Sequence, residues 1–366
     1  MSAESPLFKP LQVGPVTLGH RIAMAPLTRI RVDDNHVPLP FVADYYSQRG
    51  SFPGTLLVSE GTFIDARAGG GRNMPGIYNS AQIAAWKEIT AAVHAKGSYI
   101  FCQLWALGRS ADPSVCETEG IERLSASAVA EDEKKAPARA MTTSDIADFV
   151  NLYAQSAENA IEAGFDGVEL HGANGYLIDQ FTQDVSNKRD DGYGGSIEGR
   201  SRFCLEAVEA VVNAIGAHRT ALRLSPWSTF QGMRMADPVP QFTYLINQLR
   251  TMDLAYLHLV ESRISGNTDV ESSGSLDWAI KAWGPEQPIL IAGGLEPDSA
   301  RKLVENDYPG YQVVVVFGRY FISTPDLPFR IKHGLDLEHY DRNRFYIPKS
   351  PEGYIDYPFS AEFLKT

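Results

Sequence analysis

Eight short apolar runs recur along the chain, and segments with helical periodicity separate them. Hydrophobicity within each run is continuous rather than alternating, which is typical of parallel strands covered on both faces. Eight strand–helix units in sequence favour an α/β fold of the (β/α)8 TIM-barrel class over an open sheet. A single domain spanning residues 1–366 is a common length for such a barrel. The predicted strands are residues 21–25, 55–59, 98–104, 167–170, 220–224, 255–260, 288–292 and 312–317.

Several of the connecting helices have recognisable ends. Ser80, Ser144 and Ser196 are predicted N-caps, because a serine hydroxyl can accept a hydrogen bond from a free N–H group of the first turn. Gly164 and Gly216 follow two of these helices, where glycine tolerates the backbone conformation that ends a helix.

One connection is too long for a simple loop. An insertion after a barrel strand lies at the catalytic face, so we predict that residues 106–142, after the third strand, form a lid over the site. The alternative for the charged stretch 131–135 within it is a solvent-exposed loop that does not cover the site.

The composition argues against several functions. A net charge of −12 disfavours general nucleic-acid binding, which needs clustered Lys and Arg. Cys102, Cys116 and Cys204 fit neither a disulfide framework nor a metal site, so no metal is expected. Signal-peptide features are absent, and no apolar run reaches the roughly 18–20 residues of a membrane helix. We expect a cytoplasmic protein that binds neither nucleic acid nor membrane and acts on a small molecule, with a homodimer as one candidate assembly.

The loop after the fourth predicted strand contains candidate catalytic residues. His171 ends the strand, and Asn174 and Tyr176 follow within five positions. The first two can donate hydrogen bonds to one oxygen, and Tyr176 can deliver a proton nearby. Alone, His171 could be a structural histidine and Tyr176 a packing aromatic, but their spacing at a strand end favours catalysis.

Two glycine-containing strand ends predict a phosphate site. Gly293 and Gly294 follow the seventh strand, and Gly318 and Arg319 follow the eighth. Glycines let backbone N–H groups approach an anion, and barrels often hold phosphate at these two loops. Gly293 and Gly294 taken alone would more often form a tight turn.

Three further polar residues are predicted at the barrel mouth. Thr28, Gln103 and Arg223 come from three different strands and could surround a planar ring with polar edges. A flavin fits, because a cation near its N1/O2 edge stabilises the reduced anion. The alternative for Arg223 is a structural ion pair with Glu169, and both roles can coexist.

These motifs together resemble the old yellow enzyme family, the FMN-dependent ene-reductases, particularly its fungal members. The resemblance extends from residue 7 to residue 358, and the sequence is also similar to members that act in ergot-alkaloid assembly. It rests on residues 24–29, 103–105, 171–176, 193–198, 222–226 and 317–321.

The resemblance implies a role for each matching residue. Those expected to contact the flavin ring and ribityl chain are Pro26, Thr28, Gly61, Gln103 and Arg223. Those expected to hold the phosphate are Gly293, Gly294, Gly318 and Arg319. His171 and Asn174 would bind the substrate oxygen, Tyr176 would be the proton donor, and Trp105 and Tyr354 would line the pocket.

Two positions depart from the family pattern. Gly71 stands where many relatives have an aromatic residue beside the substrate, which should widen the pocket. Gly199 replaces an Asn that is common before Arg200. Thr28, rather than the Cys of another branch, indicates the branch in which a hydroxyl tunes the flavin.

The expected reaction is a two-step hydride transfer. NADPH reduces FMN and leaves, and an activated alkene then binds through its carbonyl oxygen to His171 and Asn174. Hydride goes to the β-carbon, and Tyr176 protonates the α-carbon. Two alternatives stay open: a glycoside hydrolase that uses Glu60, Glu169 or Glu261, and a barrel that binds flavin without catalysis.

Overall fold

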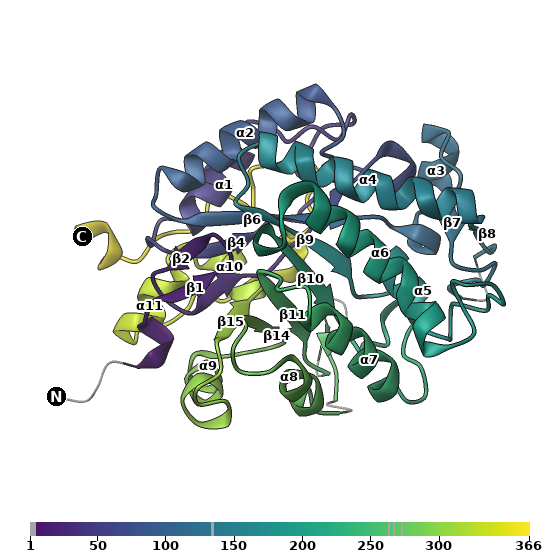
Figure 1. Ribbon diagram of the computed structural model, residues 1–366. Coiled ribbons are helices and arrows are strands. Elements are labelled where there is room, and N and C mark those ends of the chain that lie inside the picture. Colours follow the sequence, from purple (N-terminus) through teal and green to yellow (C-terminus); the bar gives the residue numbers. More distant parts are fainter. Residues whose placement is uncertain (1–4, 133–134, 263, 266–267, 272–273) are drawn as a thin grey trace.

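The computed structural model describes residues 5–132, 135–262, 264–265, 268–271 and 274–366. Eight parallel strands form a closed barrel in the order β4-β3-β15-β14-β11-β10-β9-β6, with β6 pairing back to β4 (Figure 1). This confirms the predicted barrel, and every predicted run overlaps one of its strands, although β6 and β9 end one and two residues later than predicted. The barrel strands are β3 (Ile22–Met24), β4 (Leu56–Val58), β6 (Tyr99–Trp105), β9 (Gly167–Gly172), β10 (Thr220–Leu224), β11 (Tyr256–Val260), β14 (Ile289–Ala292) and β15 (Val313–Phe317).

Helices surround the strands, as Figure 1 shows. Ser196 caps its helix as predicted, but the other two predicted caps are wrong. Asn79 accepts from the Gln82 N–H, and Thr142 forms a reciprocal capping box with Asp145, so both helices begin earlier. The main helices are α1 (Val42–Arg49), α2 (Ser80–His94), α4 (Thr143–Glu162), α5 (Leu177–Thr182), α6 (Ile197–Ile215), α7 (Val239–Arg250), α8 (Asp277–Trp283), α9 (Pro297–Lys302), α10 (Arg319–Ser323) and α11 (Leu327–His333).

The core has two parts. One lies between the strands and the surrounding helices, and the other fills the barrel interior. A hairpin of β1 (Leu11–Val13) and β2 (Val16–Leu18) adds four buried side chains to the interior cluster. Because Gly14 packs against His218 and Ala255, which precede β10 and β11, the hairpin closes the N-terminal end of the barrel. An active site is therefore expected at the other end of the barrel, where the strands have their C-terminal ends.

The long connection after β6 contains short elements of its own. They are α3 (Pro113–Glu119), β7 (Leu124–Ser125) and β8 (Arg139–Ala140). Part of the N-terminus and part of the charged stretch 131–135, for which predictions were made above, lie outside the described residues. These parts are residues 1–4 and 133–134.

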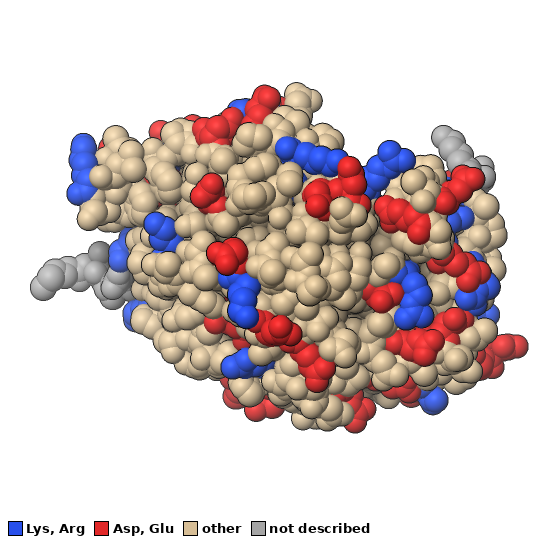
Figure 2. Space-filling view, turned by 90° about the horizontal axis from the view of Figure 1, so that it is seen from above, with Lys and Arg blue, Asp and Glu red and all other residues tan. Residues whose placement is uncertain are grey.

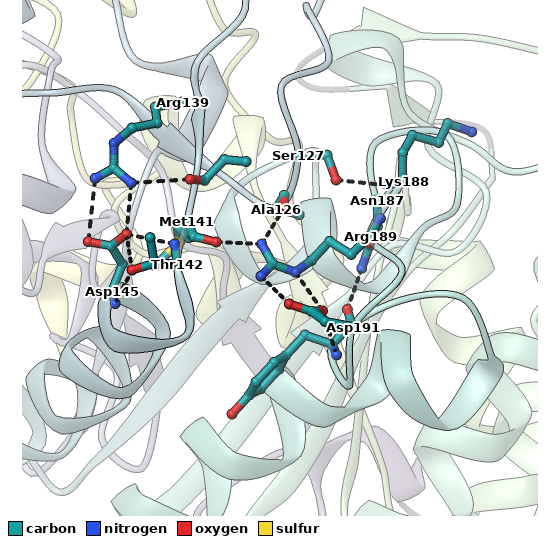
Figure 3. Close-up of polar contacts among 12 residues, drawn as sticks. Ala126, Ser127, Arg139, Met141, Thr142, Asp145, Asn187, Lys188, Arg189 and Asp191 are labelled. Atoms are coloured by element: carbon teal, nitrogen blue, oxygen red, sulfur yellow. Dashed lines mark hydrogen bonds and ion pairs between the residues drawn. The ribbon is translucent and has the colours of Figure 1, made fainter.

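The end of this insertion is tied to its neighbours (Figure 3). The Arg189 guanidinium donates to the carbonyl oxygens of Ala126 and Met141, at 2.8 and 2.6 Å. Arg139 pairs with Asp145 at the start of α4, at 2.8 Å. The insertion is therefore anchored on both α4 and the segment before α6, whereas its role as a lid stays a prediction.

The surface shows no segregation of charge on the face seen in Figure 2, where acidic side chains are spread among basic ones. Within the described part of the chain, no helix has the length and apolar character needed to cross a membrane.

Candidate active site

A cavity of about 480 Å³ lies at the C-terminal ends of the barrel strands. Such a volume is typical of sites for small molecules and cofactors. The structure brings together in its wall all nine residues predicted to contact flavin and four of the five predicted for substrate and catalysis. These lining residues are Pro26, Thr28, Gly61, Gln103, Trp105, His171, Asn174, Tyr176, Arg223, Gly293, Gly294, Gly318 and Arg319.

Arg223 supplies a positive charge to this cavity. Its side chain is almost fully buried, and its Nε atom has no hydrogen-bond partner among the described residues. The alternative of an Arg223–Glu169 ion pair is not observed, because Glu169 pairs instead with His258, at 2.8 Å. An unpaired buried donor at a cavity wall fits the polar edge of a flavin ring.

The predicted phosphate residues fit this role to different degrees. Gly293 and Gly294 have φ of +135° and +61°, a backbone conformation that favours glycine. Arg319 lies at the cavity, but its guanidinium already binds the Asp269 carboxylate through two contacts of 2.5 and 2.6 Å. Asp269 belongs to the hairpin of β12 (Ile264–Ser265) and β13 (Thr268–Asp269), and Arg342 also contacts it at 3.3 Å.

His171 is positioned as a neutral hydrogen-bond donor. Burial and the nearby Arg223 charge hold the pKa of His171 well below its usual range. Its Nδ1 accepts the backbone N–H of Ala173 at 3.3 Å, so the ring proton must be on Nε2. The neutral ring therefore offers one N–H, at Nε2, as a donor.

The loop after β9 places the other two residues. Asn174 has φ of +57°, an uncommon conformation that Asn tolerates, and its N–H donates to Ser225 Oγ at 2.7 Å. The Tyr176 ring lies edge-on to both Trp105 and His171, with centroids 4.8 Å apart in each pair. Burial raises the pKa of Tyr176 to about 12, so the phenol is protonated at neutral pH.

Helix α5 holds this loop in place, and sequence reasoning missed the residues that do so. Asp179 accepts the Gly175 N–H at 2.9 Å, and Gln180 Nε2 donates to the Gly175 carbonyl at 2.7 Å. Gln180 also donates to the carbonyl of Leu107, the second residue of the insertion, at 3.0 Å. The sequence signal that could have found them is the spacing of Asp179 and Gln180, which lie four and five residues after Gly175.

The predicted pocket role of Tyr354 is wrong. Its ring is fully buried and stacks on Tyr45 with centroids 3.9 Å apart, and it is not part of the cavity wall. The reason is that Arg29 binds the Gly353 carbonyl at 2.6 Å and pulls this segment into the core. Six other Phe and Tyr residues line the cavity and were not predicted to do so: Phe230, Phe317, Tyr320, Tyr340, Phe345 and Tyr346.

The two departures from the family pattern have structural explanations. A Cβ atom at Gly71 would lie 2.6 Å from Met74 Sδ, so Met74, a cavity residue, takes up space beside this glycine. A Cβ atom at Gly199 would lie 2.2 Å from the Gly194 carbonyl oxygen, so a side chain there requires the preceding turn to move.

The insertion lies beside the cavity rather than in its wall. Leu107, Ser110 and Val115 line a neighbouring hollow of about 570 Å³, which shares Trp105 and Tyr176 with the cavity.

The carboxylates of the glycoside-hydrolase alternative do not flank the cavity. Glu60 and Glu169 are fully buried, and neither they nor Glu261 belong to its wall. Glycoside hydrolysis needs two carboxyl groups on either side of one bound sugar, so the geometry does not support this reaction.

Comparisons with known proteins identify the family of this chain. The model of the NADH:flavin oxidoreductase / NADH oxidase family matches residues 6–338. Chanoclavine-I aldehyde reductase fgaOx3 of Penicillium roqueforti is 57% identical over 360 residues, 98% of each chain. NADP-dependent oxidoreductase lnbE of Aspergillus flavus is 53% identical over 98% of this chain and 97% of its own. At 49% identity, with 98% and 97% covered, a relative from Epichloe festucae var. lolii is named probable inactive reductase easA.

A solved structure gives the same answer. An Old Yellow Enzyme from Pichia sp. AKU4542 is 38% identical and matches with a TM-score of 0.91, over 98% of this chain and 95% of that chain. The family match excludes the glycoside hydrolase. The chain therefore belongs to the NADH:flavin oxidoreductase / NADH oxidase family and is an FMN-dependent oxidoreductase of the Old Yellow Enzyme type.

Proposed function

We propose that this flavoprotein reduces the carbon–carbon double bond of an α,β-unsaturated aldehyde or ketone, or of a nitroalkene, with NADPH as the reductant. The observation that carries the proposal is that a neutral His171, Asn174 and a protonated Tyr176 lie in the wall of the same cavity as the residues predicted to bind flavin. When bound, FMN accepts hydride from the nicotinamide and gives hydride to the alkene. The name of the relative lnbE supports an NADP cofactor.

His171 and Asn174 are proposed to bind the substrate oxygen. The donors would be the Nε2–H of the neutral His171 ring and the Asn174 side-chain amide; the ring is held by the Ala173 N–H, and the Asn174 backbone is held by Ser225 Oγ. Negative charge develops on that oxygen as the β-carbon receives hydride. Donors already in place stabilise the charge more in the transition state than in the ground state.

Tyr176 is proposed to protonate the α-carbon. Its pKa of about 12 keeps the phenol protonated until a strongly basic carbon forms next to the carbonyl group. The edge-on packing against Trp105 and His171 restricts the phenol ring, so its hydroxyl approaches from a fixed direction.

An unsaturated aldehyde with a large apolar body is the proposed substrate class. Phe230, Phe345 and Tyr346 add apolar surface to the cavity, and Phe230 and Tyr346 are partly exposed to solvent. The name of the relative chanoclavine-I aldehyde reductase fgaOx3 supports an aldehyde as the activating group.

Replacement of the acid tests this mechanism. We expect Tyr176→Phe to leave the reduction of FMN by NADPH unchanged and to slow flavin reoxidation by an enal by about 10²- to 10⁴-fold. Stopped-flow absorbance measures both steps separately. Tyr99→Phe is the matched control, because it removes a phenol hydroxyl at the start of β6, at the end of the strand opposite to the cavity residue Trp105. Equal reoxidation rates in the wild type and Tyr176→Phe would remove Tyr176 from the reaction.

A second candidate is a barrel that binds flavin without turnover, which the name of the relative easA favours. Anaerobic NADPH separates the two candidates. Bleaching of the yellow protein, followed by recovery of colour on addition of an enal, supports the reductase. Flavin that stays oxidised supports the inactive barrel.

A further inference from the structure

A row of buried polar groups begins at Gln103 in the cavity wall, and its other two members, Glu169 and His258, have no role in the proposed reaction. Gln103 on β6, Glu169 on β9 and His258 on β11 come from three strands of the barrel, and Gln103 pairs in register with Glu169. Glu169 and His258 are fully buried, and Gln103 is 2% exposed. Buried charged groups are costly unless their hydrogen bonds are satisfied, so this arrangement calls for an explanation.

The Glu169 carboxylate accepts one hydrogen bond on each oxygen. Gln103 Nε2 donates to Oε1 at 2.7 Å, and His258 Nδ1 lies 2.8 Å from Oε2. The nearby His258 and Arg223 hold the pKa of Glu169 below its usual range despite burial. An ionised carboxylate accepts but cannot donate, so both neighbours must turn an N–H group toward it.

This requirement fixes the orientation of the Gln103 amide. Because the NH2 group of Gln103 faces Glu169, its carbonyl oxygen Oε1 points away from Glu169. Gln103 is also part of the cavity wall, so that oxygen is available there as an acceptor. His258 in turn holds the Glu169 carboxylate from its other side, through Oε2.

We propose that Glu169 and His258 are positioning residues that keep the Gln103 amide oxygen turned toward the flavin site, where it selects a ring N–H group. The oxidised isoalloxazine ring of FMN has a single N–H group, at N3. A fixed acceptor recognises that group, whereas an amide free to turn over would offer a donor there for part of the time. The inference rests on the binding of FMN and is independent of the alkene chemistry.

NMR of the holoenzyme loaded with ¹⁵N-labelled FMN tests this inference. In the wild type we expect a downfield N3–H resonance that exchanges slowly with water, as a hydrogen-bonded proton does. Glu169→Gln keeps the shape of the side chain but can both donate and accept, so Gln103 is no longer held in one orientation. In this variant we expect the N3–H resonance to move upfield and to exchange faster, and FMN affinity to fall by about threefold to tenfold.

Glu60→Gln is the matched control. Glu60 is also fully buried, and burial raises the pKa of its carboxyl group to about 7, but its carboxylate accepts the backbone N–H of Arg29 and not the Gln103 amide. We expect this variant to leave the N3–H resonance unchanged, whatever it does to stability. An N3–H resonance that is the same in Glu169→Gln and in the wild type would overturn the proposal, because a purely structural role would affect stability alone.

Variants of His258 keep the test decisive should Glu169→Gln fail to fold. His258→Gln retains a side-chain N–H for Glu169 and should keep the wild-type resonance. His258→Leu removes that donor and should shift the resonance in the same direction as Glu169→Gln. Identical spectra of these two His258 variants would contradict a positioning role. Because no substrate is added, the outcome is separate from that of the Tyr176→Phe experiment.

Discussion

At the scale of the residue, Arg319 shows how one carboxylate can compete with a ligand. Asp269 binds the Arg319 guanidinium through both of its oxygens, at the place where the family resemblance predicts a phosphate. Arg319 and the neighbouring Arg342 hold the pKa of Asp269 below its usual range, so the carboxylate is charged. A phosphate group must share Arg319 with Asp269 or displace it.

Removing the Asp269 charge should strengthen FMN binding. Asp269 is 59% exposed, so its ion pair is worth little, and we expect Asp269→Asn to raise FMN affinity by about twofold to fivefold. Quenching of flavin fluorescence on titration of the apoprotein measures the dissociation constant. Asp307→Asn, which removes a carboxylate paired with Lys302, is the control. Weaker binding by Asp269→Asn would mean that Asp269 orients Arg319 rather than competing for it.

At the scale of the element, the turn between β9 and α5 sets the positions of two of the proposed active-site residues. Gly175 has φ of +78°, and a Cβ atom there would lie 2.8 Å from Met233 Cγ and 2.9 Å from Gln231 Cβ. Its two flanking residues are Asn174 and Tyr176. A side chain at this position must therefore move one or both of the proposed active-site groups.

Gly175→Ala tests this dependence. The left-handed conformation costs an alanine roughly 1–2 kcal/mol, and the clash should lower kcat/KM for an enal on the order of 10²-fold, with FMN binding unchanged. Gly120→Ala is the matched control, because Gly120 also has a positive φ, of +68°, but nothing lies within 4 Å of its added Cβ. Comparable activity in both variants would show that the turn tolerates displacement.

The elements also show what the sequence could and could not predict. Strands buried on both faces are continuous apolar runs, so all eight could be found, and barrel geometry then places residues such as His171 and Arg223 at one end. The position of Tyr354 depends on Arg29, far away in the sequence, and no local pattern reports it. The contact between Glu169 and His258 spans 89 positions and escaped notice for the same reason.

At the scale of the whole molecule, buried carboxyl groups should make stability depend on pH. Burial raises the pKa of Asp179 from 3.8 to about 7. Between about pH 4 and pH 7 the folded protein therefore holds a proton that the unfolded chain has released. The contribution of Asp179 to stability is largest at low pH and falls as pH rises through this window.

Thermal unfolding of the holoenzyme tests this linkage. We expect the apparent Tm of the wild type, relative to that of Asp179→Asn, to decrease between pH 5 and pH 8. The variant removes the titrating group, so the comparison isolates its effect from those of other carboxyl groups. A difference in Tm that is constant over this range would show that Asp179 does not change protonation on unfolding.

The hairpin of β1 and β2 has a consequence for the order of events in turnover. Because the hairpin closes one end of the barrel, the nicotinamide and the proposed alkene substrate are expected to reach the flavin ring from the opposite end. Under the proposed function, each compound would have to leave before the other binds, so the catalytic cycle would alternate between two half-reactions. An excess of either compound should then act as an inhibitor of the other.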